Sequence, residues 1–354
     1  MKLIDNKDSI VESHYSGAWL TVNRACNFRC SWCYAQGENS YSAKDSMTLE
    51  LAMRLIDLLV QVGVRNVIFI GGEPTLWHPL FQAKEYVKKN GMTASLITNG
   101  SHCGTKRFLD AVIHSPFDSI TISVKAGNPE QYKDLTGRDA YADVMRGIQN
   151  LNDRGMSCQV SITLNSFIVH NLTEVVSRAI DAGAKQISIE FCNPVFGING
   201  SQDFVLTPRE TIKCVMNHYS DLDRVTGGKL TIQQSTPFCL WPKDFLDVLI
   251  KKGQLMSGCH VMRREGIIFD PSGKLIPCNT LYQCELGQYG IDFKDKNSFL
   301  EYMRSEDMKK FYDKLTAYPS RNCIGCEDSD SCGGGCPLSW FILNPEQVIP
   351  SRTS

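Results

Sequence analysis

The sequence of 354 residues lacks a marked excess of either charge, because 37 Lys and Arg are balanced by 38 Asp and Glu, for a formal net charge of −1. A basic surface for nucleic acid or for an anionic membrane is therefore not expected. The chain also lacks an apolar run of about eighteen residues, the length that crosses a bilayer. Its first twenty residues include Asp5, Asp8 and Glu12 and no apolar core of a signal peptide. These absences predict a cytoplasmic protein that has neither nucleic acid nor a membrane as a partner.

Cysteine, in contrast, is abundant, with 15 residues. In a chain without a secretory signal, such thiols are more often metal ligands than disulfide partners. Nine of them form two groups, Cys26, Cys30, Cys33 and then Cys259, Cys278, Cys323, Cys326, Cys332, Cys336. The remaining six are expected to be small buried hydrophobic residues: Cys103, Cys158, Cys192, Cys214, Cys239 and Cys284.

Between Trp19 and Phe191, short β-branched segments alternate with segments of helical periodicity, which predicts a parallel sheet built from βα units. The predicted strands are 19–22, 67–70, 94–98, 119–124, 158–164 and 186–191. The predicted helices are 48–63, 81–89, 106–113, 141–154 and 172–181. Six units are two fewer than a closed eight-stranded barrel contains, so an open barrel and a doubly wound sheet both fit this count.

The alternation of strand-like and helical segments ends after Phe191. Loop and helix without strand alternation are expected up to residue 255, and one helical patch is expected near Phe299–Lys314. The tail has too little apolar periodicity to fold alone, so bound metal would have to stabilise it. We therefore predict a barrel over 1–191, a bridging region over 192–255 and a cysteine-rich extension over 256–354.

The first cysteine group directly follows the first predicted strand, with the spacing CxxxCxxC from Cys26 to Cys33. Three thiolates can hold a cubic iron–sulfur cluster and leave its fourth iron without a protein ligand, an open position of the kind that catalysis needs. A zinc knuckle is the alternative, although no fourth Cys or His is near in sequence.

This spacing, with the aromatic Trp32 before the last cysteine, resembles the signature of the radical S-adenosylmethionine (SAM) superfamily. The resemblance implies an α/β fold with a partial (β/α)6 barrel and a 4Fe–4S cluster whose open iron binds SAM. It also implies an external one-electron reductant of the flavodoxin or ferredoxin type. Cleavage of SAM would then give methionine and a 5′-deoxyadenosyl radical, which abstracts a substrate hydrogen.

Polar segments at the ends of the next three strands resemble the SAM-binding segments of this family: Gly71, Gly72 and Glu73 of a GGEP sequence, Asn99, and Ser123 with Lys125. The resemblance implies that the glycines let the backbone approach the SAM ammonium, with Glu73 as a nearby acceptor. It also implies that the later positions approach the ribose and the carboxylate. A tight turn is a second reading of GGEP and is compatible with the first.

The second cysteine group resembles the SPASM extension of radical SAM enzymes, because its spacings fit CX9–15GX4C and CX2CX5CX3C. The resemblance implies an inner auxiliary cluster on Cys259, Cys278 and Cys336 and an outer one on Cys323, Cys326 and Cys332. The seventh cysteine of the pattern is absent. Glu346, an exogenous ligand or an open iron would replace it, or a single auxiliary cluster assembles. A zinc ribbon is the alternative for the whole group.

Two further features of the sequence limit the class of substrate. Sulfatase maturases have Asp after the Cys of GX4C, whereas this chain has Asn279, which cannot act as a general base. Only 25 residues precede Cys26, fewer than the recognition domain of many peptide maturases needs. We predict an oxidoreductase that modifies a C–H bond of a small natural-product or sugar-type substrate by oxidation, epimerisation, decarboxylation or cross-linking. A maturase of a ribosomally made peptide, acting with a separate recognition protein, is the alternative.

Two other interpretations concern single features. An iron–sulfur electron-transfer or sensor protein would explain the cysteines but not the GGEP segment or Asn99.

Cys192 follows the sixth predicted strand, where a thiol could return a hydrogen atom to the substrate in an epimerisation. A packed cysteine is the alternative for that position. Auxiliary clusters would suit a net oxidation, because a substrate radical must lose a second electron.

Overall fold

The computed structural model describes residues 15–35, 45–156, 158–195, 201–233, 235–256 and 259–351, which form one sheet of 11 strands. The strands are β1 (Gly17–Thr21), β2 (Asn66–Ile70), β3 (Thr93–Thr98), β4 (Ser119–Val124), β5 (Cys158–Leu164), β6 (Gln186–Phe191), β7 (Leu230–Gln233), β8 (Leu255–Met256), β9 (Gly266–Phe269), β10 (Lys274–Leu275) and β11 (Gly287–Gln288). Their order is β11-β10-β9-β1-β2-β3-β4-β5-β6-β7-β8, parallel from β9 to β8 and antiparallel at β10 and β11.

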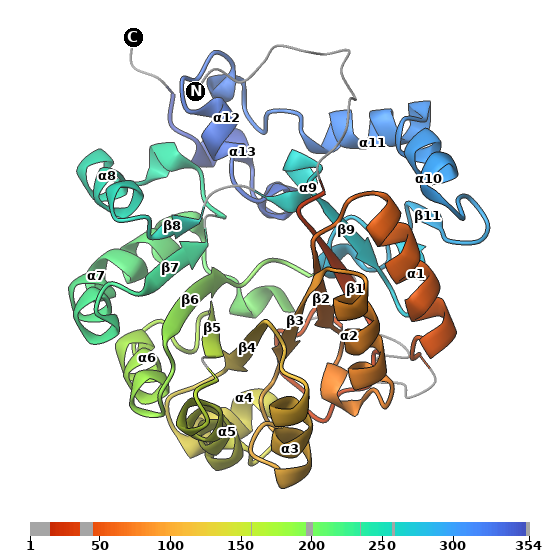
Figure 1. Cartoon of the computed structure of the whole chain (residues 1–354). Coiled ribbons are helices and arrows are strands. Elements are labelled where there is room, and N and C mark those ends of the chain that lie inside the picture. The colour runs from red at the N-terminus through yellow and green to blue at the C-terminus, as the bar shows by residue number, and fades with distance from the viewer. Residues whose placement is uncertain are drawn as a thin grey trace.

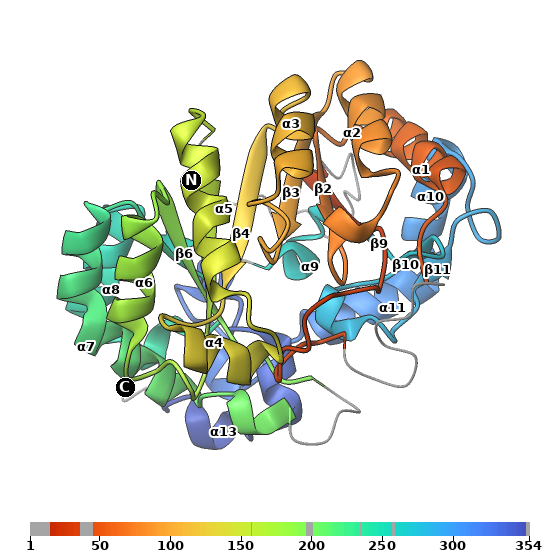
Figure 2. The same cartoon turned by 90° about the horizontal axis from the view of Figure 1, so that it is seen from below.

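Helices cover the outer side of the curved sheet (Figure 1). The α-helices are α1 (Leu49–Gln61), α2 (Leu80–Lys89), α3 (Lys106–His114), α4 (Pro129–Thr136), α5 (Tyr141–Asp153), α6 (Leu172–Asp181), α7 (Pro208–Thr226), α8 (Lys243–Lys251), α9 (His260–Arg263), α10 (Lys296–Met303), α11 (Glu306–Leu315), α12 (Ser329–Cys332) and α13 (Pro345–Val348). Figure 2 shows α4, α11 and α13 toward the same end of the sheet, although Figure 1 shows α4 on the opposite side of the barrel from α11 and α13.

The α/β fold with a parallel, open barrel is confirmed. From β1 to β8 the strand order follows the chain order, whereas a doubly wound sheet reverses its order at a switch point. The six strands and five helices predicted up to Phe191 are all present, within a few residues. Helix α4 was not expected, although Asn128 caps it and Gly137 ends it in the left-handed conformation.

The prediction for the rest of the chain needs correction. Strands β7 and β8 continue the barrel sheet in a region where loop and helix are expected, and β9 pairs with β1. These strands have two to four residues, too few to show a period-2 pattern clearly. The helical patch near 299–314 consists of two helices, α10 and α11, because Ser305 caps a new helix there.

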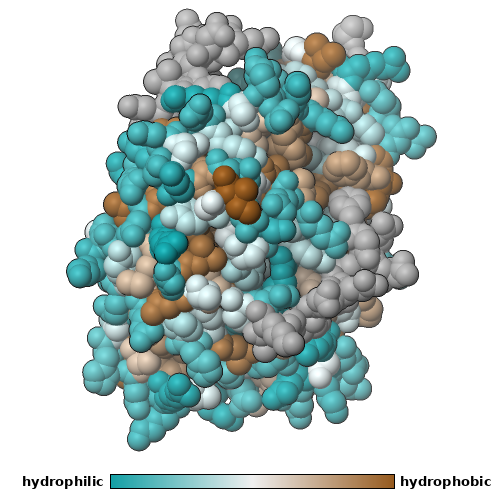
Figure 3. All heavy atoms as spheres, turned by 90° about the vertical axis from the view of Figure 1, so that its right-hand side faces the viewer, coloured by the Kyte–Doolittle hydropathy of each residue, from teal (hydrophilic) through white to brown (hydrophobic). Residues whose placement is uncertain are grey.

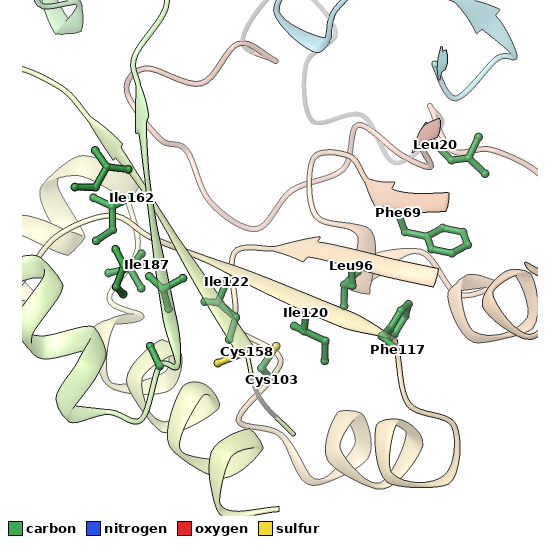
Figure 4. Close-up of a cluster of buried hydrophobic side chains, with 14 of the residues drawn as sticks. Leu20, Phe69, Leu96, Cys103, Phe117, Ile120, Ile122, Cys158, Ile162 and Ile187 are labelled. Atoms are coloured by element: carbon green, nitrogen blue, oxygen red, sulfur yellow. The ribbon is translucent and has the colours of Figure 1, made fainter. Parts of the chain in front are cut away.

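The hydrophobic core lies between the sheet and its helices, where Figure 4 shows Phe69, Leu96, Ile122 and Ile187 among the buried side chains. Cys103 and Cys158 belong to this core, as expected of small apolar residues. Cys192 and Cys214 are also buried. The expectation of burial is wrong for the two remaining scattered cysteines, because Cys284 is half-buried and Cys239 is exposed.

Hydrophilic side chains dominate the face of the molecule shown in Figure 3, and small hydrophobic patches lie between them. This is the usual pattern for the solvated side of amphipathic helices. In the part of the chain that the structure describes, no helix combines the length and the apolar character needed to span a bilayer.

Candidate active site

The first cysteine loop, Cys26 to Cys33, follows β1 and rests on the end of α4. The backbone N–H of Arg29 donates to the carbonyl of Thr136 at 2.7 Å, and that of Ser31 donates to Leu135 at 3.1 Å. These are carbonyls of the last helical turn, which have no acceptor role inside the helix. Helix α4 therefore holds the loop in place.

Both glycines of the GGEP turn are required by their contact with this same loop. A Cβ atom on Gly71 would lie 2.4 Å from Asn23 Oδ1, and one on Gly72 would lie 2.4 Å from the carbonyl oxygen of Ala25. Two backbone hydrogen bonds cross this contact, from Gly72 N to Asn23 O at 2.8 Å and from Glu73 N to Ala25 O at 2.7 Å. The glycines thus allow two backbones to meet at the start of the cysteine loop.

The Glu73 carboxylate is fully buried and accepts four hydrogen bonds. Thr75 donates from its backbone N–H at 3.0 Å and from its hydroxyl at 2.6 Å, and the Thr98 hydroxyl donates at 2.7 Å. The fourth donor is the Asn99 backbone N–H at 2.7 Å. Three of these bonds end on Oε1 and one ends on Oε2, so most of the acceptor capacity of this carboxylate is used within the protein. We propose that Glu73 positions Asn99 rather than contacting SAM directly.

The Asn99 side chain continues this network into the cysteine loop. Its Nδ2 donates to Asn27 Oδ1 at 2.8 Å and lies 3.9 Å from the Cys26 sulfur, while its Oδ1 accepts from the Ser101 hydroxyl at 2.7 Å. The chain Glu73–Asn99–Asn27 therefore connects the ends of β2 and β3 to the loop. Sequence reasoning placed Asn99 at the site but missed Asn27.

The three thiols of the loop lie near one another and near one cation. Burial raises the pKa of Cys26 to about 11, although the Phe28 N–H donates to its sulfur at 3.3 Å. Burial raises the pKa of Cys30 to about 12, against the lowering effect of Lys125. Lys125 also lies 6.0 Å from the ring of the buried Trp32. Loading iron must therefore displace protons, and the Lys125 charge offsets the negative charge that results.

The residues of the loop fit an iron–sulfur cluster. The hydroxyl of the fully buried Tyr132 has no hydrogen-bond partner among the described residues, and its pKa is raised by burial and, to a lesser extent, by the Cys30 thiol. A sulfur atom of a bound cluster would supply an acceptor for it. No three His, Cys, Asp or Glu side chains in the described ranges converge on a point that holds a single ion. A cubic cluster does not need such convergence, because each thiolate binds a different iron.

The tail cysteines separate into two sets in space. Burial raises the pKa of Cys336 to about 12, and the neighbouring thiols of Cys259 and Cys278 raise it further. Burial also raises the pKa of Cys332, with further contributions from Cys323 and Cys326. The structure thus brings together the inner and outer triplets that the SPASM pattern implies. The roles of these triplets as cluster ligands remain predictions.

The first cysteine loop and the inner triplet lie near the same tyrosine. Burial raises the pKa of the Tyr34 hydroxyl, and both Cys33 and Cys278 add to that effect, so Tyr34 lies between the two groups. Arg24 connects the same parts, because its guanidinium lies 3.7 Å from the Asp270 carboxylate and 4.6 Å from the Tyr282 ring. The tail is therefore attached to the barrel at the cysteine loop itself.

Asn279 also reaches this junction. Its Oδ1 accepts a hydrogen bond from the Thr21 hydroxyl at 3.1 Å, at the last residue of β1. The residue next to Cys278 therefore lies at the mouth of the barrel, where a side chain would meet a substrate. An amide there can form hydrogen bonds but cannot accept a proton as a base.

The inner face of the sheet is polar, which the sequence analysis did not recognise. Strand register aligns Ser123 with Ser161, Ser161 with Ser188, and Ser188 with Thr231, so one row of hydroxyls crosses four strands. The isoleucines between them face the helices, because side chains alternate along a strand (Figure 4). The period-2 alternation of Ser or Thr with Ile in β4, β5 and β6 is the signal that could have predicted this row.

Above this row lies a second residue that sequence reasoning missed. Glu190 is one position from the end of β6, on the same face as Ser188. Burial raises the pKa of its carboxyl, while the Ser161 hydroxyl and Lys125 lower it. Cys192 lies two residues further and is buried, with a pKa raised to about 12 by burial against the effect of Lys125. The Lys125 ammonium group thus interacts electrostatically with Cys30, Glu190 and Cys192.

Residues 20–177 match the Radical SAM superfamily, which includes the cysteine loop, the GGEP turn and the polar strand ends. The chain contains a radical SAM domain. Proteins with this domain are enzymes that bind a 4Fe–4S cluster and SAM, and the cysteine-rich tail is consistent with a SPASM extension.

Two solved structures share the fold of nearly the whole chain. Streptococcus suis SuiB bound to the precursor peptide SuiA superposes with a TM-score of 0.71 at 14% identity, covering 97% of this chain and 76% of SuiB. The enzyme anSMEcpe with bound AdoMet gives a TM-score of 0.69 at 19% identity, covering 91% and 89%. At these identities the likeness concerns the fold.

Curated relatives resemble the radical SAM chain over a shorter stretch. A probable GTP 3′,8-cyclase of Thermococcus kodakarensis is 30% identical over 130 residues, which are 37% of this chain and 41% of that protein. GTP 3′,8-cyclase of Streptomyces coelicolor is 31% identical over 159 residues, 44% and 45% of the two chains. The chain thus spans less than half the length of these two relatives.

The iron and zinc content of the protein distinguishes auxiliary iron–sulfur clusters in the tail from a zinc ribbon. Anaerobic reconstitution is expected to load about 8 to 12 irons per chain, the sum of two to three 4Fe–4S clusters. Metal analysis by mass spectrometry, with acid-labile sulfide as the control, measures this. About four irons with one zinc would show instead that the tail is a zinc ribbon.

Proposed function

We propose that this protein is a radical SAM enzyme that abstracts hydrogen from a small polar substrate of natural-product or sugar type. When bound by Cys26, Cys30 and Cys33, a 4Fe–4S cluster supplies the electron that cleaves SAM to a 5′-deoxyadenosyl radical. The observation that supports the proposal is the meeting of this cysteine loop with the polar inner face of the sheet. Lys125 joins the two, because it faces both Cys30 and Glu190.

The inner face supports a small polar substrate. Closed barrels fill their interior with layers of Val, Ile and Leu, whereas Ser123, Ser188 and Thr231 are small, only partly buried, and bear hydroxyls. Such side chains leave room and offer both donors and acceptors. Glu190 and Lys125 add one carboxyl and one amine, which suit the hydroxyl or amino groups of a sugar-like molecule.

The same region assigns further roles to this chain's residues. Asn279 would orient the substrate through its amide from the opposite side of the barrel mouth, beside Thr21. Cys192 would return a hydrogen atom in an epimerisation, since a thiol with a raised pKa keeps its S–H bond at neutral pH, and the external one-electron reductant together with a proton would convert the resulting thiyl radical back to the thiol. The inner triplet lies next to the first loop, close enough to take part in removing a second electron in an oxidation.

Modification of a ribosomally made peptide is the second candidate. SuiB and anSMEcpe have both been solved with bound peptides, and their folds cover nearly the whole chain. The resemblance to the two GTP 3′,8-cyclases described above extends over less than half of the chain, so it supports the shared core chemistry more than a GTP substrate.

The test compares 5′-deoxyadenosine formation with and without candidate substrates. Reconstituted protein with SAM and dithionite is expected to form 5′-deoxyadenosine slowly, and small polyhydroxylated or aminated molecules should accelerate it. Glu190→Gln should lower this acceleration at least about tenfold, because a hydrogen bond to a charged group contributes about 1.5–3 kcal/mol. The matched control is Glu50→Gln, whose carboxylate is exposed on α1.

The outcomes separate the two candidates and the role of Glu190. Acceleration by peptides and not by small molecules would favour the maturase. A Glu190→Gln variant that loses the slow reaction as well would show that Glu190 binds SAM. No 5′-deoxyadenosine under any condition would contradict the proposed function.

A further inference from the structure

The outer triplet, Cys323, Cys326 and Cys332, lacks a fourth ligand in the SPASM pattern, and the structure places another cysteine beside it. Cys239 lies 84 residues before Cys323, in the short helix η3 (Phe238–Leu240) that follows β7. The thiols of Cys332, Cys323 and Cys326 all interact electrostatically with the Cys239 thiol. Four thiols from two distant parts of the chain are therefore close together.

Direct contacts hold the segment before Cys239 against the tail. The backbone N–H of Phe238 donates to the Cys332 sulfur at 3.2 Å. The backbone N–H of Cys336 donates to the Ser235 carbonyl at 2.9 Å. A Cβ atom on Gly335 would lie 2.9 Å from both Pro237 Cδ and the Ser235 carbonyl oxygen, so this glycine is required for the contact. The proximity of Cys239 to the outer triplet thus follows from a packed interface.

The segment is also fixed from the barrel side. The indole N–H of the buried Trp241 donates to the Thr236 hydroxyl at 2.8 Å, and its ring stacks on Phe245 of α8 at 6.0 Å. Phe238 is buried. Among these anchored neighbours Cys239 is exposed, and its thiol is near enough to those of Cys332, Cys323 and Cys326 to interact with them electrostatically. A small residue in such a fixed turn is well placed to be a ligand.

Glu346, the alternative fourth ligand that the sequence offers, already uses its carboxylate in other interactions. The Glu346 carboxylate accepts the backbone N–H of Arg321 at 3.0 Å and the hydroxyl of Ser320 at 3.0 Å. The Arg321 guanidinium lies 3.5 Å from the same group. Glu346 therefore stabilises the turn that leads into Cys323, and binding iron would cost it these interactions.

We propose that Cys239 is the fourth thiolate of the outer auxiliary cluster, together with Cys323, Cys326 and Cys332. The proposal rests on the auxiliary clusters of the proposed function and gives the outer one a complete set of four cysteines, the common ligand set of a 4Fe–4S cluster. The outer site then has no open iron and suits electron transfer alone. The inner site, for which the described residues provide Cys259, Cys278 and Cys336, keeps the open position.

The first experiment measures the clusters and not turnover. Reconstituted wild-type protein is expected to hold about twelve irons, and Cys239→Ala to lose between one and four of them, with loss or change of one 4Fe–4S signal in electron paramagnetic resonance. The matched control is Cys284→Ala, whose half-buried thiol has its pKa raised by burial alone and should keep the wild-type iron content and spectrum. Equal iron and identical spectra in Cys239→Ala and wild type would overturn the proposal. A wild-type content of about eight irons that Cys239→Ala does not lower would overturn it too.

A second measurement uses the unaltered chain and does not depend on how a variant folds. Iodoacetamide under anaerobic conditions should label Cys239 at least tenfold more slowly in reconstituted protein than in chelator-treated protein, as followed by peptide mass spectrometry. Rapid labelling of Cys239 in the reconstituted protein would contradict iron ligation. Formation of 5′-deoxyadenosine tests the proposed function separately, because it depends on the first cysteine loop whichever residue completes the outer cluster.

Discussion

Replacement of Cys26, Cys30 and Cys33 by Ala is expected to abolish 5′-deoxyadenosine formation while about eight irons stay bound in the tail. The reason is spatial, because these thiols belong to one loop that follows β1 and rests on α4, whereas the tail ligands come from segments more than two hundred residues later. Liquid chromatography of the SAM reaction and metal analysis of the same sample measure both effects.

The control for this variant is Cys284→Ala, which removes a thiol from the tail and leaves the first loop intact. Circular dichroism should show the same secondary structure in wild type and triple variant, since the loop is held by α4 and by the GGEP turn as well as by metal. Full 5′-deoxyadenosine production by the triple variant would disprove the assignment of the catalytic cluster. A variant with no iron at all would disprove independent tail sites.

Glu73→Gln is expected to destabilise the fold by about 2–4 kcal/mol and to lower loading of the first cluster. Glutamine has the same shape, but its amide group offers hydrogens where the carboxylate accepts them. One of the four donors, from Thr75, Thr98 or Asn99, would then face another donor in a fully buried place. Urea unfolding of the metal-free protein measures the stability, and iron content measures the loading.

Glu50→Gln serves as the matched control, because its carboxylate is exposed and pairs with Arg54 one turn away on α1. Such a surface pair contributes little, so that variant should unfold at the wild-type urea concentration. If Glu73→Gln is as stable as this control and loads iron normally, Glu73 is not the link between the GGEP turn and Asn99. Its place would then be at the cofactor, as the family resemblance implies.

The first half of the fold could be predicted because its signals are local. Strands β2 to β6 each contain two or more β-branched residues, β1 contains the apolar Trp19 and Leu20, and each following helix has its own cap or apolar period. The short strands β7 to β11 have no such signal. Their existence depends on neighbours that are already in place, as with β9, which pairs beside β1. Helix α4 has only eight residues, but Asn128 and Gly137, which lie at its two ends, are sequence signals that could have predicted it.

The parts of the site that depend on residue spacing along the chain could be predicted from the sequence. The parts that depend on how distant segments fold together could not. The spacing of Cys26, Cys30 and Cys33 indicates a cluster without any structure. The fourfold acceptor role of Glu73 cannot be derived that way, because two of its four hydrogen bonds come from Thr98 and Asn99 at the end of β3. Cys239 was grouped with the buried cysteines, since nothing in its local sequence connects it to a segment 84 residues later.

The position of β1 between β2 and β9 has a consequence for synthesis on the ribosome. One edge of β1 receives its partner only when residues 266–269 emerge, and the adjoining contact of Ser16 with Glu265 joins residues 249 positions apart. Until then a nascent chain that has already formed β1 to β8 exposes an unpaired edge, the kind of surface on which strands of other molecules add. A chain halted before β9 is therefore expected to aggregate or to remain bound to chaperones, even though every residue of the first cysteine loop has been made.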